Sequence, residues 1–327
     1  MTTGRKLLLA LRFAAALSIV AVAHLVNLDS GSRLTLWADI FNAGHVVMMG
    51  IFSLVMLGLS SDALEGRLPS RLSHYVVAFF ITVAVGALSE VAQIPGPRNA
   101  DALDVARDAT GAFCFLGLNM TWDKSLSPLW QRWGRWSRPA AVSLILVVLV
   151  FSWSTALRWT VAFYLRDSSF PVLATFDSPY EHLFRTTRNA AVEATAAPET
   201  WSTETHTGKV GRVVFQPSTR SGFAINQVSP DWSAYRSLQL NAYLDSQRSA
   251  ELVVQVEDIH YRGATGGRLS YTVGMDPGTN SITVPLDDNV ALLGTRPLDL
   301  HRIAKVYFLT SDTTQTITIY VDDIRLR

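Results

Sequence analysis

The chain has 327 residues but a single cysteine, Cys114, and no marked excess of charge of either sign. One cysteine excludes an intrachain disulfide, so any exported domain must be stable without one. Residues 1–167 carry 14 basic against 10 acidic residues, and residues 168–327 carry 14 against 17. Neither half is basic enough to indicate a nucleic-acid partner. Internal repeats and low-complexity segments are also lacking.

Long hydrophobic runs are confined to the first half of the chain. There are five of them, and they cover residues 7–26, 43–59, 72–92, 103–120 and 139–159. A helix of about 20 apolar residues crosses the ~30 Å hydrocarbon layer of a bilayer. We therefore expect a bundle of about five membrane-spanning helices in residues 1–165, of which the fourth is the least hydrophobic.

The first run leaves a second interpretation open. Arg5 and Lys6 precede it, and the segment 21–23 (Ala-Val-Ala) resembles the cleavage site of a signal peptide. We favour a retained helix, because Arg12 interrupts the run and further hydrophobic runs follow.

Lys and Arg in the short connecting segments predict the orientation, because cytoplasmic loops collect positive charge. With the N-terminus inside, the inner segments hold Arg5, Lys6, Arg67, Arg71, Lys124, Arg132, Arg135 and Arg138, and the outer loops hold Arg33 and Arg98. Five crossings then place the C-terminal half outside. This predicts a protein of the cytoplasmic membrane with an external C-terminal domain.

Polar side chains cluster where the expected helices reach the outer side. The cluster comprises His45, Glu90, Gln93, Arg98, Asp104 and Asp108. Residues three or four apart share a helical face, as Asp104 and Asp108 do. Ionisable groups are costly at membrane depth, so the cluster predicts an outward-facing polar pocket with a functional role. The alternative is that these residues are solvated helix ends and local ion pairs.

These positions resemble the VanZ-like family of small bacterial membrane proteins. The pattern is Glu90-x-x-Gln93, Arg98 and Asp104-x-x-x-Asp108-x-x-Gly111, preceded by His45, and the resemblance covers about residues 1–120. The family usually has Asn in place of Asp108 and Lys in place of Asn42, so this site is more acidic than the family pattern. The resemblance implies a location in the bacterial inner (cytoplasmic) membrane, with the C-terminal domain outside or periplasmic. It also implies a link to glycopeptide (teicoplanin) tolerance and names no reaction.

From about residue 168 the hydrophobic runs shorten and alternate, with turn residues between them. These runs cover residues 211–215, 237–244, 251–257, 268–273, 281–285, 304–309 and 316–324. Several short strands without a helical pattern between them are typical of an all-β sandwich. We therefore expect a second domain over residues 168–327.

This second domain resembles carbohydrate-binding modules and galactose-binding-like jelly rolls. The matching segments are Phe176-Asp177, His206-x-Gly208-Lys209, the run 230–238 and the closing run 319–326. The resemblance implies a structural calcium ion held by Asp177 with Asp322 or Asp323, since calcium prefers several carboxylate and carbonyl oxygens. Turn capping by these aspartates is the alternative, and no other cofactor is indicated.

Glycan binding by such a fold uses aromatic faces and polar groups on one sheet. Our candidates are Tyr243, His260, Tyr261 and Tyr271, although strand alternation alone does not fix which way each points.

Two functions fit these observations. The favoured one is a non-enzymatic envelope protein that lies in the lipid bilayer and presents a glycan-binding β-sandwich outside it. The alternative is an integral-membrane enzyme acting on a lipid-linked or envelope glycan, with Glu90 or Asp104 as general acid or base and His45 as partner. No nucleophile elbow, phosphate-binding loop or complete metal motif accompanies these residues.

Overall fold

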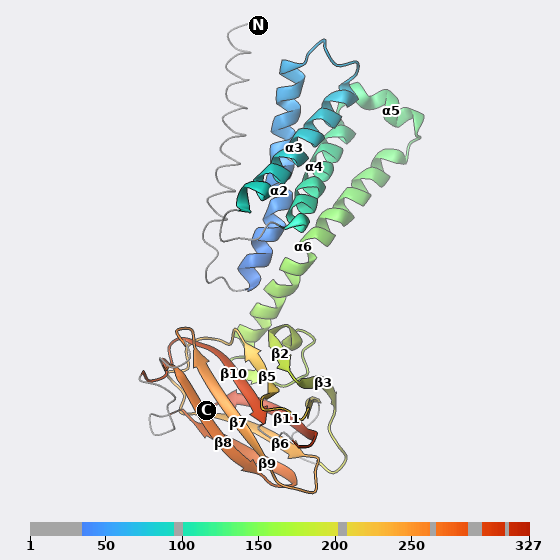
Figure 1. Cartoon of the computed structure of the whole chain (residues 1–327). Coiled ribbons are helices and arrows are strands. Elements are labelled where there is room, and N and C mark those ends of the chain that lie inside the picture. The colour runs from blue at the N-terminus through green and yellow to red at the C-terminus, as the bar shows by residue number, and fades with distance from the viewer. Residues whose placement is uncertain (1–34, 95–100, 202–207, 262–265, 287–295, 311–313) are drawn as a thin grey trace. The chain divides into compact units, whose positions relative to one another are not determined.

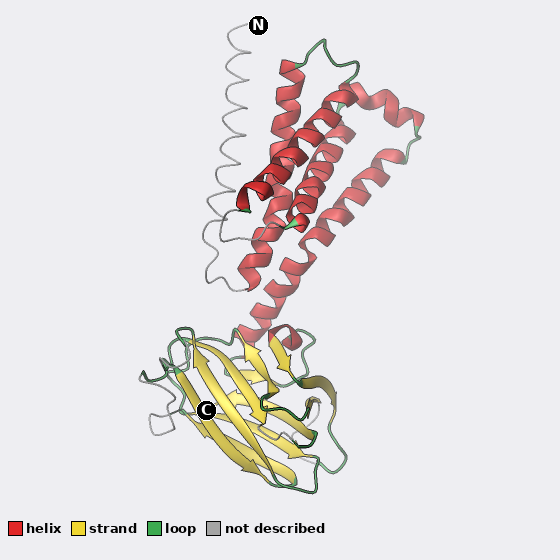
Figure 2. Cartoon of the chain, viewed as in Figure 1, coloured by secondary structure: helices red, strands yellow, loops and turns green. Residues whose placement is uncertain are grey.

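The computed structural model describes residues 35–94, 101–201, 208–261, 266–286, 296–310 and 314–327. The chain divides into two compact units, Met1–Trp159 and Thr160–Arg327. Figure 2 shows that the described part of the first unit is helical, whereas strands dominate the second. The division falls inside the last helix, so its final turns belong to the second unit, a few residues before the boundary expected from the sequence.

The first unit is built from long helices (Figure 1). They are α2 (Thr35–Ala63), α3 (Arg71–Gln93), α4 (Ala102–Trp122) and α6 (Ser137–Ser169), with a short 3-10 turn (Lys124–Leu126) and α5 (Ser127–Arg132) before α6. Side-chain caps define two of the starts: the Ser70 hydroxyl accepts from the Ser73 amide, and the Asp101 carboxylate accepts from the Leu103 amide.

Three of the described helices, α2, α3 and α6, are long and apolar enough to cross a membrane. The expected number of five is therefore not supported. The first expected span, residues 7–26, lies outside the described residues. The fourth expected span does form a helix, α4, but Asp104, Arg107 and Asp108 in its first two turns make it too polar to qualify.

Many large apolar side chains of α3 and α6 point outward. They include Phe80, Leu88, Leu144, Val147, Val150 and Phe151, the last of which is 78% exposed. An exposed apolar surface of this kind marks an interaction with a membrane or a partner. By contrast, the carboxylates of Glu90, Asp104 and Asp108 are buried inside the bundle.

Glycines let α2 and α4 approach closely. A Cβ atom on Gly111 of α4 would lie 2.1 Å from the Val46 carbonyl oxygen of α2, and one on Gly50 would lie 2.3 Å from the Phe115 ring. The helix axes can therefore come closer than side chains would otherwise allow. This contact sets the distance between the polar residues on the two helices.

The second unit is a two-sheet β-sandwich, as the sequence predicted. Its strands are β1 (Val172–Ala174), β2 (Arg185–Arg188), β3 (Ala190–Ala196), β4 (Lys209–Phe215), β5 (Ser221–Asn226), β6 (Ser237–Leu244), β7 (Ala250–Asp258), β8 (Arg268–Met275), β9 (Gly278–Pro285), β10 (Ile303–Thr310) and β11 (Ile317–Leu326). One sheet has the order β3-β4-β11-β6-β9 with β1 beside β11, and the other has the order β2-β5-β10-β7-β8.

The sandwich core lies between the two sheets and follows the two-residue alternation of the strands. In β6 every second residue is buried, from Leu238 to Leu244. In the other sheet Phe223 and Phe308 are directly paired, and their rings stack with centroids 4.9 Å apart. Trp232 is fully buried, and its indole N–H donates to the Ser229 carbonyl at 2.7 Å. This packing leaves the outer faces of both sheets to polar and aromatic residues.

The α2–α4 contact gives a direct test of the helical fold. We expect Gly111→Ala to lower the stability of the helical unit by about 1–3 kcal/mol or more, because the added methyl group meets backbone rather than a flexible side chain. The measurement is thermal unfolding of the full chain in detergent. Gly44→Ala on α2 is the matched control: no atom of the described residues lies within 4 Å of the added Cβ, so helix propensity should leave stability unchanged or raise it by up to about 1 kcal/mol. Equal effects of the two substitutions would contradict the close approach.

Candidate functional sites

The helical unit brings three helices together at a buried polar site. His45 on α2 and Asp108 on α4 are both buried, and Nδ1 of His45 lies 3.0 Å from Oδ1 of Asp108. Gly86 on α3 faces the same carboxylate, since a Cβ atom there would lie 2.4 Å from Oδ2 of Asp108. A buried carboxylate needs such a partner, because leaving it unpaired in an apolar interior costs several kcal/mol.

The other two carboxylates of the predicted cluster are also buried. Glu90 accepts a hydrogen bond from the Asp101 backbone amide at 3.0 Å, which ties the end of α3 to the start of α4. Asp104 forms an ion pair with Arg107 one turn later on α4. Both Glu90 and Asp104 lie near enough to Asp108 to act on it electrostatically. The structure thus gathers His45, Glu90, Asp104 and Asp108.

Two predicted members cannot be placed in the site. Gln93 ends α3, but its side chain is outside what the structure describes, and Arg98 lies outside the described residues altogether. Arg107 is the cation found beside the site instead. Its three-residue spacing from Asp104 is the signal in the sequence that identifies the pairing.

A cavity of about 360 Å³ adjoins Arg107 in the helical unit. Polar groups from three helices line part of its wall: Asp39 and Asn42 from α2, Arg107 and Thr110 from α4, and Ser152 and Thr155 from α6. We call this space the helical cavity. It can admit a small polar ligand next to Arg107, the ion-pair partner of buried Asp104.

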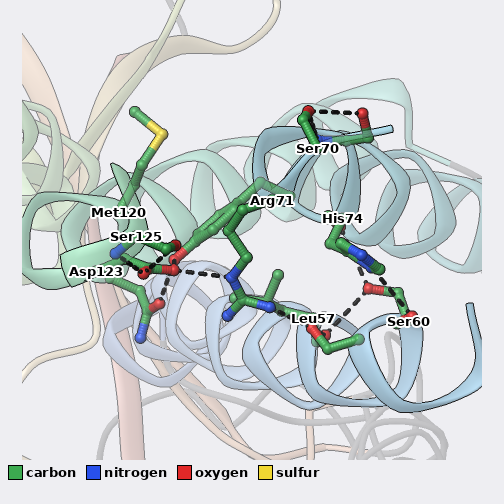
Figure 3. A network of polar contacts seen from close by, with 12 residues as sticks. Leu57, Ser60, Ser70, Arg71, His74, Met120, Asp123 and Ser125 are labelled. Atoms are coloured by element: carbon green, nitrogen blue, oxygen red, sulfur yellow. Dashed lines mark hydrogen bonds and ion pairs between the residues drawn. The ribbon is translucent and has the colours of Figure 1, made fainter. Parts of the chain in front are cut away.

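A second polar network, which the sequence analysis missed, lies at the opposite end of the bundle (Figure 3). The Arg71 guanidinium donates from Nε to Oδ2 of Asp123 at 2.9 Å, and the Tyr75 hydroxyl donates to the same oxygen at 2.9 Å. Burial opposes ionisation of Asp123, but hydrogen bonds from Ser125, Arg71 and Tyr75 outweigh it, so the pKa of Asp123 lies well below its usual range.

This network ties helix ends together. Arg71 also donates from Nη1 to the Ser61 hydroxyl at 2.5 Å, so the first residue of α3 holds the end of α2 as well as the residue after α4. Ser61 lies sixteen residues after His45 on α2, which is about 24 Å along a helix at 1.5 Å per residue. The two polar sites are therefore separate. In the sequence, the sign of this second network was the pair of opposite charges Arg71 and Asp123, each next to a connection between helices.

The four aromatic candidates of the sandwich do not form one surface. Tyr243 lies on the outer face of the first sheet, where its ring stacks on Trp201 with centroids 6.0 Å apart. Tyr271 pairs with Val254, whose side chain is in the core, so it points between the sheets. His260 and Tyr261 follow β7 at one end of the second sheet. Of these four, Tyr261 is the one that lines a cavity there.

That cavity, which we call the sheet-end cavity, has a volume of about 300 Å³. It is lined at the ends of β5 and β7 and at the start of β10 by Asn226, Gln227, Glu257, Asp258, Ile259, Tyr261, Ala304 and Lys305. Buried Glu257 forms ion pairs with Arg268 and with Lys305, whose Nζ is 3.1 Å from Oε2. The Arg268 guanidinium also lies over the Tyr261 ring, 4.0 Å from its centroid.

The outer face of the same sheet continues from this cavity. Tyr307 of β10 pairs with Gln255 on one side and Ala224 on the other, and these residues point away from the core. Nζ of Lys305 is 5.0 Å from the Tyr307 ring centroid. Tyr307 is therefore an aromatic residue on an outer sheet face that sequence reasoning missed, because register decides its direction and register is not visible in the strand pattern.

Asp258 organises the loop that carries Tyr261. Its Oδ1 accepts from the His260 amide at 2.9 Å and from Nη2 of Arg296 at 2.8 Å, and its Oδ2 accepts from the Asp299 amide at 3.0 Å. Burial alone would raise the pKa of Asp258, but these hydrogen bonds and the Arg296 charge outweigh it and lower the pKa.

The aspartates predicted to bind calcium are engaged with the protein. Asp177 accepts from the Lys209 amide at 2.7 Å, Asp322 accepts from the Asp323 amide at 2.7 Å, and Asp323 pairs with Arg325. Within the described ranges, no three His, Cys, Asp or Glu side chains form a group that could hold a metal ion. These contacts fit the turn-capping alternative, and calcium binding stays a prediction.

Neither family models nor curated proteins match this chain. Membership of the VanZ-like family therefore stays a prediction. Solved structures give weak similarities. An exo-β-agarase is 18% identical, with a TM-score of 0.41 over 48% of this chain and 24% of that chain. A family 11 carbohydrate-binding module from Clostridium thermocellum, in complex with a β-1,3-1,4-mixed-linked tetrasaccharide, is 16% identical, with a TM-score of 0.37 over 47% of this chain and 93% of that one.

A family 30 carbohydrate-binding module of a cellulosomal cellulase from the same organism is 11% identical, with a TM-score of 0.33 over 44% of this chain and 90% of that chain. The match to the agarase spans about a quarter of that enzyme. None of the three scores reaches 0.5, so the assignment of a site below is made from the geometry of this chain.

The Asp258 contacts predict a pH dependence. Because the folded pKa is below the unfolded value of about 3.9, the carboxylate stabilises the fold fully above pH ~4, and this contribution is lost as the pH falls through the folded pKa. We expect Asp258→Asn to cost about 1–3 kcal/mol at pH 7, with the difference from wild type shrinking below pH 4. Unfolding of the full chain between pH 7 and pH 2 measures this. Exposed Asp245→Asn should stay within about 0.5 kcal/mol of wild type, and a pH-independent Asp258→Asn deficit would contradict the assignment.

Proposed function

We propose that this chain is a bacterial envelope protein that α2, α3 and α6 hold in the cytoplasmic membrane, with the more polar α4 crossing beside them, and whose β-sandwich binds a glycan on the outer side. Support for the membrane comes from the three apolar helices and their exposed side chains. Support for the orientation comes from the excess of Lys and Arg in the segments assigned to the inside. We propose no catalytic step in the sandwich.

The observation that carries the glycan proposal is the outer face of the β2-β5-β10-β7-β8 sheet. It places the Tyr307 ring between short and polar side chains, and it ends at the sheet-end cavity beside Tyr261. An aromatic face packs against the C–H surface of a sugar ring, and nearby carboxylate, amide and ammonium groups hydrogen-bond its hydroxyls. Glu257, Asn226 and Lys305 supply those groups.

Glycan retention by the full chain tests this proposal. The purified protein in detergent is incubated with insoluble polysaccharides, including peptidoglycan, agarose and mixed-linked β-glucan, and the bound fraction is measured. We expect retention on at least one of them, and we expect Tyr261→Ala and Tyr307→Ala each to weaken it by about tenfold, which corresponds to ~1.4 kcal/mol.

Tyr243→Ala is the matched control, since Tyr243 is an aromatic residue on the outer face of the opposite sheet. It should leave retention unchanged while thermal unfolding shows that all three variants fold. Loss of retention in Tyr243→Ala alone would move the site to the other sheet. Absence of retention on every polysaccharide would remove the glycan proposal and leave a scaffold role.

The alternative function is an integral-membrane enzyme, and the His45–Asp108 hydrogen bond is the observation that favours it. A histidine held by a buried carboxylate is oriented for proton transfer. The sequence suggested Glu90 or Asp104 as the partner of His45. In the structure His45 is hydrogen-bonded to Asp108, so Asp108 replaces them as the proposed partner. The helical cavity would hold the substrate, and Arg107 in its wall would bind an anionic group.

Glycopeptide susceptibility tests this alternative. In a sensitive host, the enzyme hypothesis expects the wild-type chain to raise tolerance to teicoplanin, and His45→Gln or Asp108→Asn to abolish the increase at equal protein levels. His74→Gln is the control, because His74 is also buried but bonds to the Ser60 carbonyl in the network at the other end of the bundle. Full tolerance in His45→Gln would show that the pair serves the fold alone.

A further inference from the structure

The second unit contains a second, larger cavity. The last turns of α6, β1, the 3-10 turn Glu181–Phe184, β2 and β5 enclose about 490 Å³. We call it the α6 cavity. All of its lining residues belong to the unit Thr160–Arg327, and Asn226 is the residue that it shares with the sheet-end cavity.

The wall of the α6 cavity is largely apolar. Its apolar lining residues include Leu165 of α6, Phe184, Ile225 of β5 and Val228 just after β5. Ile225 and Val228 are buried, whereas Leu165 is 37% exposed and so lies at the rim. A cavity of this size and lining fits an apolar chain better than a saccharide, whose hydroxyls would be left unpaired against such a wall.

A partly buried cation, Arg185 of β2, also lines this cavity. Its pairing with Ile225 turns its side chain toward the core side of the sheet, and its guanidinium lies 4.8 Å from the centroid of the Phe176 ring. Its Nε and Nη1 atoms are buried and have no hydrogen-bond partner among the residues that the structure describes. Arginine has five N–H donors and no acceptor, so an oxygen acceptor is what these two groups lack. Leaving them unsatisfied costs more than a typical hydrogen bond contributes.

Glu181 is near Arg185 but its oxygens are already occupied. Oε2 accepts from the Phe176 amide at 2.7 Å, and Oε1 accepts from the Thr175 amide and hydroxyl at 3.3 and 3.2 Å. Burial raises the pKa of Glu181 and lowers the pKa of Arg185, although the two charges act on each other in the opposite sense. Burial therefore disfavours both charges, and an oxyanion at Arg185 would offset the cost for the cation.

We propose that the α6 cavity binds the anionic head group of an amphiphile. The phosphate or carboxylate oxygens accept from Nε and Nη1 of Arg185, and the apolar chain lies against Leu165, Phe184 and Val228. The continuity of the cavity wall with α6, one of the helices apolar enough to span a membrane, favours a lipid as the source of this ligand. The same chemistry could come from a free fatty acid or from inorganic phosphate, and the experiment separates these sources.

The test uses the full chain in a non-ionic detergent with four probes: dioleoylphosphatidylglycerol, dioleoylphosphatidylcholine, oleate and sodium phosphate. Native mass spectrometry measures retained ligand, and thermal unfolding measures the shift in Tm. We expect the protein to retain phosphatidylglycerol or oleate and to be stabilised by it. The tighter binder shows whether the oxyanion is a phosphate or a carboxylate. If phosphatidylcholine were retained as well as phosphatidylglycerol, the requirement for an anionic head group would be wrong. If sodium phosphate raised the Tm as much as phosphatidylglycerol did, the requirement for an apolar chain would be wrong.

Arg185→Met is the decisive variant, because it keeps the length of the side chain and removes the two buried N–H groups that lack acceptors. It should weaken binding of the anionic lipid about tenfold or more and should leave the ligand-free Tm equal to or above that of wild type. Arg188→Met, at an exposed position on the same strand, should alter neither quantity. A lower ligand-free Tm with unchanged lipid retention would show that Arg185 serves packing and would overturn the proposal.

Leu165→Trp gives a second measure that does not depend on the arginine. The larger ring at the rim should narrow the cavity and reduce lipid retention by several fold while the core stays intact. Unchanged retention in this variant would place the lipid elsewhere on the protein.

Discussion

The constraint on which the structure depends is the placement of charge inside the helical unit and of apolar surface outside it. Phe80 of α3 and Phe151 of α6 are well exposed, whereas the carboxylates of Glu90 and Asp108 are buried. This distribution is the reverse of that of a soluble helical bundle, and a lipid environment accounts for it. Because buried charges need partners, the same constraint draws α2, α3 and α4 around the His45–Asp108 pair.

The buried charges at the two ends of the bundle are paired in different ways, and this difference indicates which end has a function beyond stability. At one end the Arg71–Asp123 ion pair joins helix termini directly, as a structural clamp would. At the other end three carboxylates share a space that includes Arg107 and adjoins the helical cavity. Crowding of like charges is unfavourable for stability alone, which makes this end the better candidate for a ligand or a proton.

The sequence predicted the elements with strong periodicity and missed those without it. The expected strand over residues 237–244 is β6 to the residue, because every second position is apolar. β2 is Arg-Thr-Thr-Arg and β3 is rich in alanine, so neither carries a strand pattern, and pairing with β5 and β4 decides their conformation. The helical spacing predicted that Asp104 and Asp108 share a face, but the partner of His45 and the outward direction of Tyr307 depend on tertiary packing and register, which no local pattern encodes.

Labelling from one side of the membrane tests the central claim that the helices carry the sandwich across the bilayer. Cys114 is buried and would first be replaced by alanine. Single cysteines would then be placed at Ser246 in the sandwich, which is partly exposed, and at Gln131 in α5, which is exposed. We predict that a membrane-impermeant maleimide labels the Ser246→Cys protein in intact spheroplasts and labels the Gln131→Cys protein only after the membrane is permeabilised. Labelling of Ser246→Cys only after permeabilisation would contradict the account.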